Sequence, residues 1–408
     1  MTKFHIDFAS TLLTRFAVIS AGLVGSVLTA RFLGPAGRGE YFLCLTLIAF
    51  ALQFGNLGLA PATAYWAARQ PALARPLSAN AIWISLLVGL PLAAIVSLAG
   101  HDGLAWVKAD TGNLAIAALS LPFGLYSLIA GNVLIGQGRI HEYNLIEVMV
   151  RVSGVAALVL AAFVSSSPGI FLAAAGLVAV LNALLLASRT PARPTEHSYA
   201  LFADCTGYAS RSWIANLLAY AVSRYSSFPL SHMVGTDALG IWSIAMQIGD
   251  ALLSVPAALG AVLLSRVVRA DNPWLEMRYY LTRAAALMAG ICLAVAAVGQ
   301  PLITSVFGAA FKDAYLQLLL MLPGIFFLSL TSVVSQYLGA SRLPVFVLAV
   351  WAVGLALQIL LAAAWIPTYG PYGAMGAISA TYAFVFLALW GLAWRHARAR
   401  GLHPFSSN

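Results

Sequence analysis

The sequence predicts an all-α integral membrane protein with twelve transmembrane helices in two six-helix lobes. Of the 408 residues, 61% are hydrophobic and only 9% are charged. A soluble globular domain has about 25% charged residues, so a soluble chain of this composition could not cover its surface. Two further observations support the prediction: a series of long apolar runs, and an internal repeat that relates the two halves of the chain.

The apolar runs are each long enough to cross the hydrocarbon core, which takes about 20 residues. The predicted spans are 10–31, 40–61, 79–99, 113–135, 143–164, 169–188, 207–230, 239–264, 281–303, 315–337, 345–366 and 373–394. A polar linker, residues 191–204, separates an N-terminal lobe, 1–190, from a C-terminal lobe, 205–408. The connections between spans are short, which leaves no room for a soluble catalytic domain.

The internal repeat appears as two matches between the halves. "LGPAGRGEY" aligns with "VGTDALGIW" and pairs Gly34 with Gly235, whereas "IGQGRIHEYN" aligns with "LGASRLPVFV" and pairs Gly136 with Gly339. The offsets are 201 residues (34 to 235) and 203 residues (136 to 339). An even number of spans in each half gives both the same orientation. The lobes are therefore expected to be related by a pseudo-two-fold axis along the membrane normal.

The stretch Arg31 to Phe42 is unusually polar for this chain. The repeat retains its glycines and an aromatic residue but has no Arg where Arg38 stands. We therefore interpret the stretch as a tight turn at the outer face and not as a phosphate-binding loop. Arg38 and Glu40 are then expected outside the hydrocarbon.

Lysine and arginine indicate the orientation, because cytoplasmic loops carry the excess. With both termini cytoplasmic, the outer segments contain only Arg31, Arg38, Lys108 and Lys312. The inner segments contain Lys3, Arg69, Arg75, Arg139, Arg189, Arg193, Arg266, Arg269, Arg278, Arg283, Arg342, Arg395, Arg398 and Arg400. The net charge of +9 thus fits membrane loops, and no nucleic-acid partner is expected. Neither cysteine nor histidine has metal-ligand spacing, so no metal is expected.

Several stretches resemble the lipid-linked oligosaccharide flippases of the polysaccharide transport family. This family belongs to the multidrug, oligosaccharidyl-lipid and polysaccharide exporter superfamily. The stretches, in chain order, are "ARFLGPAGRGEYFLCLTL", "FGNLGLAPATAYWAARQ", "LIGQGRIHEYN", "VGTDALGIWSIAMQIGDALLSVPAALG", "VFGAAFKDAYLQLLLMLPG" and "IPTYGPYGAMGAISATYAF". One difference is Ser226, which stands where such families often have an acidic residue after Arg224.

The resemblance implies a non-enzymatic flippase of the O-antigen or exopolysaccharide type, without a cofactor, in the bacterial inner (plasma) membrane. Its substrate would be a polyprenyl-pyrophosphate-linked oligosaccharide, moved from the cytoplasmic to the outer leaflet by alternating access. A proton or sodium gradient would drive transport, and a glycan polymerase would be a possible partner. Such transport serves lipopolysaccharide and exopolysaccharide synthesis.

Four arginines inside the predicted spans are candidates for binding the pyrophosphate. They are Arg15, Arg151, Arg211 and Arg224. A charge at the bilayer centre costs about 2.5–3.5 kcal/mol, so each needs a reason to be there. Arg suits phosphate because it presents paired donors and stays charged. We expect Arg15, Arg211 and Arg224 to face a cavity between the lobes, although a long Arg near a span end can also reach the headgroups.

Glu147 and Asp250 are the acidic residues within the spans and the candidates for ion coupling or gating. Glu147 and Arg151 are four residues apart, so they share a helix face and could form an internal ion pair or a pair that opens for substrate. Asp250 has no cation one turn away in its own helix. It could carry a proton, since burial disfavours the charged form, or pair with Arg224 or Arg211.

Asn56 and Asn216 are the polar residues proposed for glycan hydroxyls, although such groups more often join helices through hydrogen bonds. An alternative function is a cation-coupled drug exporter of the same superfamily. Exporters of cationic drugs tend to have acidic cavities, which the excess of arginine disfavours. A membrane enzyme would need a sizeable outer loop with paired acids, and the longest one, "GHDGLAWVKADTGN", is short.

Overall fold

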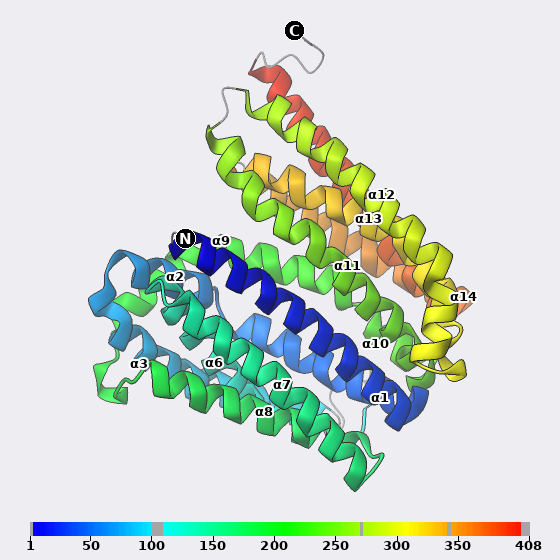
Figure 1. Ribbon diagram of the computed structural model, residues 1–408, viewed down its shortest axis with the longest axis horizontal. Coiled ribbons are helices and arrows are strands. Elements are labelled where there is room, and N and C mark those ends of the chain that lie inside the picture. The colour runs from blue at the N-terminus through cyan, green and yellow to red at the C-terminus, as the bar shows by residue number, and fades with distance from the viewer. Residues whose placement is uncertain (1–2, 100–108, 270–271, 341–343, 401–408) are drawn as a thin grey trace. The chain divides into compact units, whose positions relative to one another are not determined.

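The computed structural model describes residues 3–99, 109–269, 272–340 and 344–400, and Figure 1 shows its arrangement. Every regular element in these ranges is helical. Contacts between residues divide the chain into two compact units, Met1–Leu217 and Leu218–Asn408. The all-α prediction is therefore confirmed for the described residues.

In its described residues, the N-terminal unit consists of eight α-helices, short 3-10 and π segments, and the first part of α9. In Figure 1, α7 and α8 run side by side, and α1 also packs against α7. The bounds are α1 Lys3–Gly55, α2 Leu59–Arg69, η1 Pro71–Leu73, α3 Ala74–Ile84, η2 Ser85–Gly89, α4 Leu90–Leu98, α5 Thr111–Ala118, α6 Leu121–Gly136, α7 Ile140–Val164, α8 Pro168–Arg189, η4 Pro194–Glu196 and α9 Tyr199–Arg224.

The core of this unit joins α2, α3 and α6 with the start of α9. Leu77 and Ile129 are buried in it, and so are Leu201 and Cys205 of α9. The unit boundary therefore lies inside α9, after Leu217, because the first turns of this helix pack on the N-terminal unit. The predicted lobe limits, 1–190 and 205–408, stay a prediction.

The segment before α9 is also fastened to the N-terminal unit. The amide of Asn80 donates to the Ser198 carbonyl at 3.0 Å, and its Oδ1 accepts from the Ser198 N–H at 3.0 Å. The Trp83 indole donates to the Pro194 carbonyl at 2.9 Å. These bonds hold the predicted linker against α3.

Helix α1 contains a sharp bend at Gly34, where φ is +65°. A side chain disfavours this left-handed conformation, and glycine does not. The bend separates two arms, residues 3–33 and 35–55, at the position of the predicted tight turn, and thus confirms it. Arg38 is nevertheless only 3% exposed and donates to Ser26 and Thr29 of the first arm.

The C-terminal unit is built around α13, which packs against α11, α12 and α14. An aromatic cluster of Trp274, Tyr337 and Trp390 joins α12, α13 and α14. The bounds are α10 Ser227–Met233, α11 Thr236–Arg269, α12 Pro273–Val306, η5 Ala309–Phe311, α13 Ala314–Ala340 and α14 Pro344–Ala399.

Glycines with a positive φ lie at turns of this unit, and Gly235 and Gly370 are two of them. Gly235, between α10 and α11, has φ +119°, and Gly370 bends α14 at φ +57°. Gly235 is the predicted repeat partner of Gly34, and both have a positive φ. At this position the sequence repeat therefore corresponds to a repeated turn.

Eight helices in the described part are long and apolar enough to cross a membrane. Their large apolar side chains are often exposed, for example Leu87, Phe163, Leu293 and Leu360, as expected of a surface that contacts lipid. The eight segments are Thr14–Gly55, Pro71–Leu98, Thr111–Gly136, Ile140–Val164, Pro168–Arg189, Pro273–Val306, Ala314–Gly339 and Val345–Ala399. The chain is thus a multi-pass membrane protein, and the number of twelve spans stays a prediction.

Candidate functional site

A cluster of charged side chains lies on α1 and α7 within the apolar segments of the N-terminal unit. Arg15 Nη1 lies 3.8 Å from Glu147 Oε1. Tyr143 lies one turn before Glu147. Its phenol interacts electrostatically with Glu147, Arg15 and Arg151. The sequence suggested a pair between Glu147 and Arg151. The structure instead pairs Glu147 with Arg15, because α1 packs along α7.

The three charges of this cluster differ in exposure. The Arg15 side chain is 63% exposed, that of Glu147 only 15%, and Arg151 is also exposed. Glu147 Oε2 is buried and has no hydrogen-bond partner among the described residues. Two exposed guanidinium groups with one largely buried carboxylate give this face a net positive charge, which suits an anion.

A second ion pair lies in the C-terminal unit, between Arg224 Nη2 of α9 and Asp250 Oδ2 of α11. The Arg224 side chain is 16% exposed and that of Asp250 is 43% exposed. Tyr220 and Tyr382 lie near enough for both charges to act on their phenols. The pair corresponds to the alternative role that the sequence suggested for Asp250, as a partner of Arg224.

Ser226, the position where related families often have an acid, is fully buried next to this pair in the chain. Its Oγ accepts a hydrogen bond of 2.8 Å from Gln358 Nε2 of α14, which is also fully buried. A neutral hydrogen bond thus occupies this position. It joins the α9–α10 junction to α14.

The structure separates the remaining predicted site residues. Asn56 is buried, and its Oδ1 accepts from the Ala60 N–H at 2.9 Å, so this atom holds the start of α2. Asn216 is exposed on α9. The Arg211 side chain lies outside the described residues.

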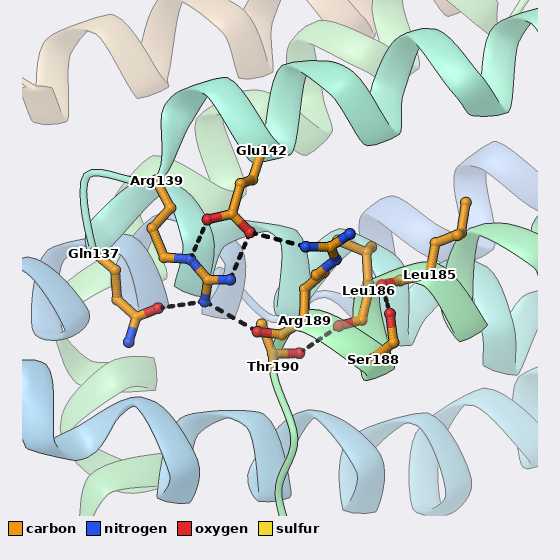
Figure 2. Close-up of polar contacts among 8 residues, drawn as sticks. All are labelled: Gln137, Arg139, Glu142, Leu185, Leu186, Ser188, Arg189 and Thr190. Carbon is orange, nitrogen blue, oxygen red and sulfur yellow. Dashed lines mark hydrogen bonds and ion pairs between the residues drawn. The ribbon is translucent and has the colours of Figure 1, made fainter. Parts of the chain in front are cut away.

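A third polar cluster connects α6, α7 and α8 at their ends (Figure 2). Arg139 donates from Nε and Nη2 to Glu142 at 2.8 and 2.6 Å, and from Nη1 to the Arg189 carbonyl at 3.0 Å. The hydrogen bond to Glu142 raises the pKa of Arg139 above its usual value. Arg189 Nη1 lies 3.7 Å from the same carboxylate. Because Arg139 also bonds the last carbonyl of α8, we interpret this cluster as structural.

Tyrosines beside both ion pairs were not among the predicted residues. Tyr143 precedes Glu147 by four positions, and Tyr220 precedes Arg224 by four. This spacing places each tyrosine on the same helix face as its charged neighbour, so it could have been recognised in the sequence. Among the described residues, no group of three or more His, Cys, Asp or Glu could hold a metal ion.

The family model described as "Polysaccharide biosynthesis protein" matches residues 7–266, more than half of the chain. The chain therefore belongs to this family, in agreement with the resemblance seen in the sequence. No curated protein matches it.

Solved structures of transporters and flippases share the fold. The chain is similar to an inward-facing multidrug resistance MATE family transporter of the MOP superfamily, with 15% identity and a TM-score of 0.77, over 97% of this chain and 99% of that one. It is also similar to the lipid II flippase MurJ, with 14% identity and a TM-score of 0.73, over 99% and 94% of the two chains. The Vibrio cholerae MATE transporter VcmN gives 14% identity and a TM-score of 0.67, over 96% of each chain.

Proposed function

We propose that this protein is a flippase that moves a polyprenyl-pyrophosphate-linked oligosaccharide from the cytoplasmic to the outer leaflet of the bacterial inner membrane by alternating access. Membership of the polysaccharide biosynthesis family supports a glycan as cargo. The MurJ-like fold supports a flippase, because MurJ is described as a lipid II flippase. In this proposal both termini are cytoplasmic and a glycan polymerase is a partner.

The observation that carries the proposal is the exposed positive face of α1 and α7. Arg15 and Arg151 are exposed within apolar segments, with Glu147 as the neighbouring acid. A guanidinium group facing lipid at the bilayer centre costs about 2.5–3.5 kcal/mol or more. A water-filled path removes this cost, and a pyrophosphate in the path would bind the two arginines.

The other predicted residues take secondary roles in this proposal. Arg211 and Arg224 add positive charge, and Asn216 binds glycan hydroxyls. Asn56 takes part through its amide nitrogen or the second lone pair of its Oδ1, since one lone pair already accepts from the Ala60 N–H. Glu147 and Asp250 gate the site, each by pairing with an arginine until a proton or sodium ion, or the substrate phosphate, separates the pair.

We further propose twelve spans in two six-helix lobes. Eight segments meet the criteria of length and hydropathy. The bends at Gly34 and Gly370 divide two of them into two arms each. Helices α9 and α11, of 26 and 34 residues, supply two more, which brings the number of spans to twelve.

A cation-coupled exporter of small molecules is the second candidate function, favoured by the similarity to MATE transporters. The two functions differ in the charge that the site must bind. In the N-terminal unit, Arg15 and Arg151 against Glu147 leave one positive charge in excess. That balance favours an anionic substrate over a cationic drug.

The proposed role of Arg224 is tested by Arg224→Ala and Arg224→Lys in cells that need the glycan at their surface. Hydrogen bonds to a charged group contribute about 1.5–3 kcal/mol, so Arg224→Ala is expected to reduce surface glycan about 10-fold or more at equal protein levels. Arg224→Lys keeps the charge and is expected to retain part of the activity. Lys312→Ala is the matched control, because Lys312 is exposed and is expected in an outer segment. Unchanged surface glycan in both Arg224 variants would contradict the role of this residue.

A further inference from the structure

A break in the helical backbone lies between α1 and α2. α1 ends at Gly55 and α2 begins at Leu59. In between, Leu57 has φ +49° and Gly58 has φ +78°. Leucine rarely adopts a positive φ, so surrounding contacts must hold this conformation.

The break changes the hydrogen bonds of the backbone. In a continuous helix the Leu57 N–H would bond the Gln53 carbonyl, but here it donates to the Phe54 carbonyl at 3.3 Å. The Gln53 carbonyl therefore loses its helical partner. A backbone carbonyl without a partner is costly in a membrane protein, where water is scarce.

Trp213 of α9 replaces the missing donor. Its indole Nε1 donates to the Gln53 carbonyl at 2.7 Å. Its ring also contacts Phe54, with ring centroids 6.1 Å apart. One side chain thus satisfies the freed carbonyl and packs on the arm of α1 that ends at the break.

We propose that Trp213 is a positioning residue: its bond to the Gln53 carbonyl fixes α9 against the break between α1 and α2. Asn216, proposed above to contact the glycan, follows Trp213 by three residues and therefore lies about one helical turn away. Displacement of α9 would move Asn216 with it. The effect on transport rests on the proposed function, whereas the bond itself does not.

A second tryptophan of the same unit provides a matched control. The buried Trp66 indole nitrogen in α2 has no hydrogen-bond partner among the described residues, although its ring packs against the core. Trp66→Phe therefore removes a comparable volume and no such bond. Trp213→Phe removes the volume and the bond, and Trp213→His returns a ring N–H donor.

The first measurement is amide hydrogen exchange over residues 54–62 in the full-length protein. Losing a bond of about 1.4 kcal/mol corresponds to about 10-fold faster local opening. We expect such acceleration in Trp213→Phe, little change in Trp66→Phe, and slower exchange again in Trp213→His. Equal exchange in the two Phe variants would overturn the proposal. Loss of folded protein in Trp213→Phe, with folded Trp213→His and Trp66→Phe, would support it.

The second measurement is transport of a polyprenyl-pyrophosphate oligosaccharide in proteoliposomes, normalised to folded protein. We expect Trp213→Phe to raise the apparent KM several-fold, because Asn216 is displaced, and Trp213→His to restore part of it. A proportional loss of rate in both Phe variants, with KM unchanged, would overturn the positioning role. If the wild type does not move this lipid, the proposed function is wrong, and hydrogen exchange still decides whether the bond holds the break.

Discussion

Two arginines within the apolar segments have different kinds of hydrogen-bond partners. Arg38, beside the bend at Gly34, donates from Nη1 to the Ser26 carbonyl and the Thr29 hydroxyl at 2.6 and 2.5 Å, and from Nη2 to Ser26 Oγ at 2.8 Å. Arg224 instead pairs with an acid on another helix. The sequence indicates that a charged arginine in an apolar segment costs free energy. The oxygen atoms that accept its hydrogen bonds depend on tertiary packing.

Removing Arg38 is expected to destabilise the protein. Its hydrogen bonds join the two arms of α1, and a bond to a charged group contributes about 1.5–3 kcal/mol. We expect Arg38→Ala to lower the free energy of unfolding by about 2–3 kcal/mol and Arg38→Lys to lower it less, because lysine has fewer fixed donors. Thermal unfolding in detergent would measure this, with Lys312→Ala as the control. Equal stability of the Arg38→Ala and Lys312→Ala variants would show that the bonds to Arg38 do not stabilise the bend.

Among the helices, the sequence predicted the positions of the turns more accurately than the contacts between helices. Gly34 and Gly235, matched by the repeat, both adopt a positive φ. Gly136 and Gly339, the second matched pair, differ in their surroundings. A Cβ on Gly136 would lie 2.4 Å from the Ala64 carbonyl oxygen, whereas one on Gly339 has no described atom within 4 Å. A repeat in sequence predicts a shared backbone shape, and the contacts depend on which helix lies opposite.

Gly136 and Gly339 can be compared directly by replacing each with alanine. Gly136→Ala forces α6 away from α2, and overpacking of this kind costs about 1–3 kcal/mol. Gly339→Ala meets no described neighbour and favours the helix by up to about 1 kcal/mol. We expect the first variant to lower the midpoint of thermal unfolding and the second to leave it unchanged or raise it. Similar destabilisation of both variants would mean that the close contact with Ala64 does not explain the need for glycine at position 136.

For the molecule as a whole, the sequence predicted a multi-pass membrane protein that resembles the polysaccharide transport family, and the family match and the fold agree with this. The apolar runs indicate the membrane spans, because each segment that crosses the lipid must be apolar and must satisfy its own backbone hydrogen bonds. The sequence could not indicate that Leu201 and Cys205 pack on the N-terminal unit or that Arg15 is the partner of Glu147. Both depend on contacts between helices far apart in the chain.

In the proposed function, the exposed arginines of α1 and α7 bind an anionic lipid-linked glycan. The most direct test is a flipping assay with purified protein in proteoliposomes, using a labelled polyprenyl-pyrophosphate oligosaccharide and, in parallel, a cationic drug. We expect the wild type to move the glycolipid but not the drug. We expect the double variant Arg15→Ala/Arg151→Ala to lose about 10-fold or more of this activity, and Lys312→Ala to retain it. Drug transport without glycolipid transport, or full glycolipid transport by the double variant, would contradict the proposed function.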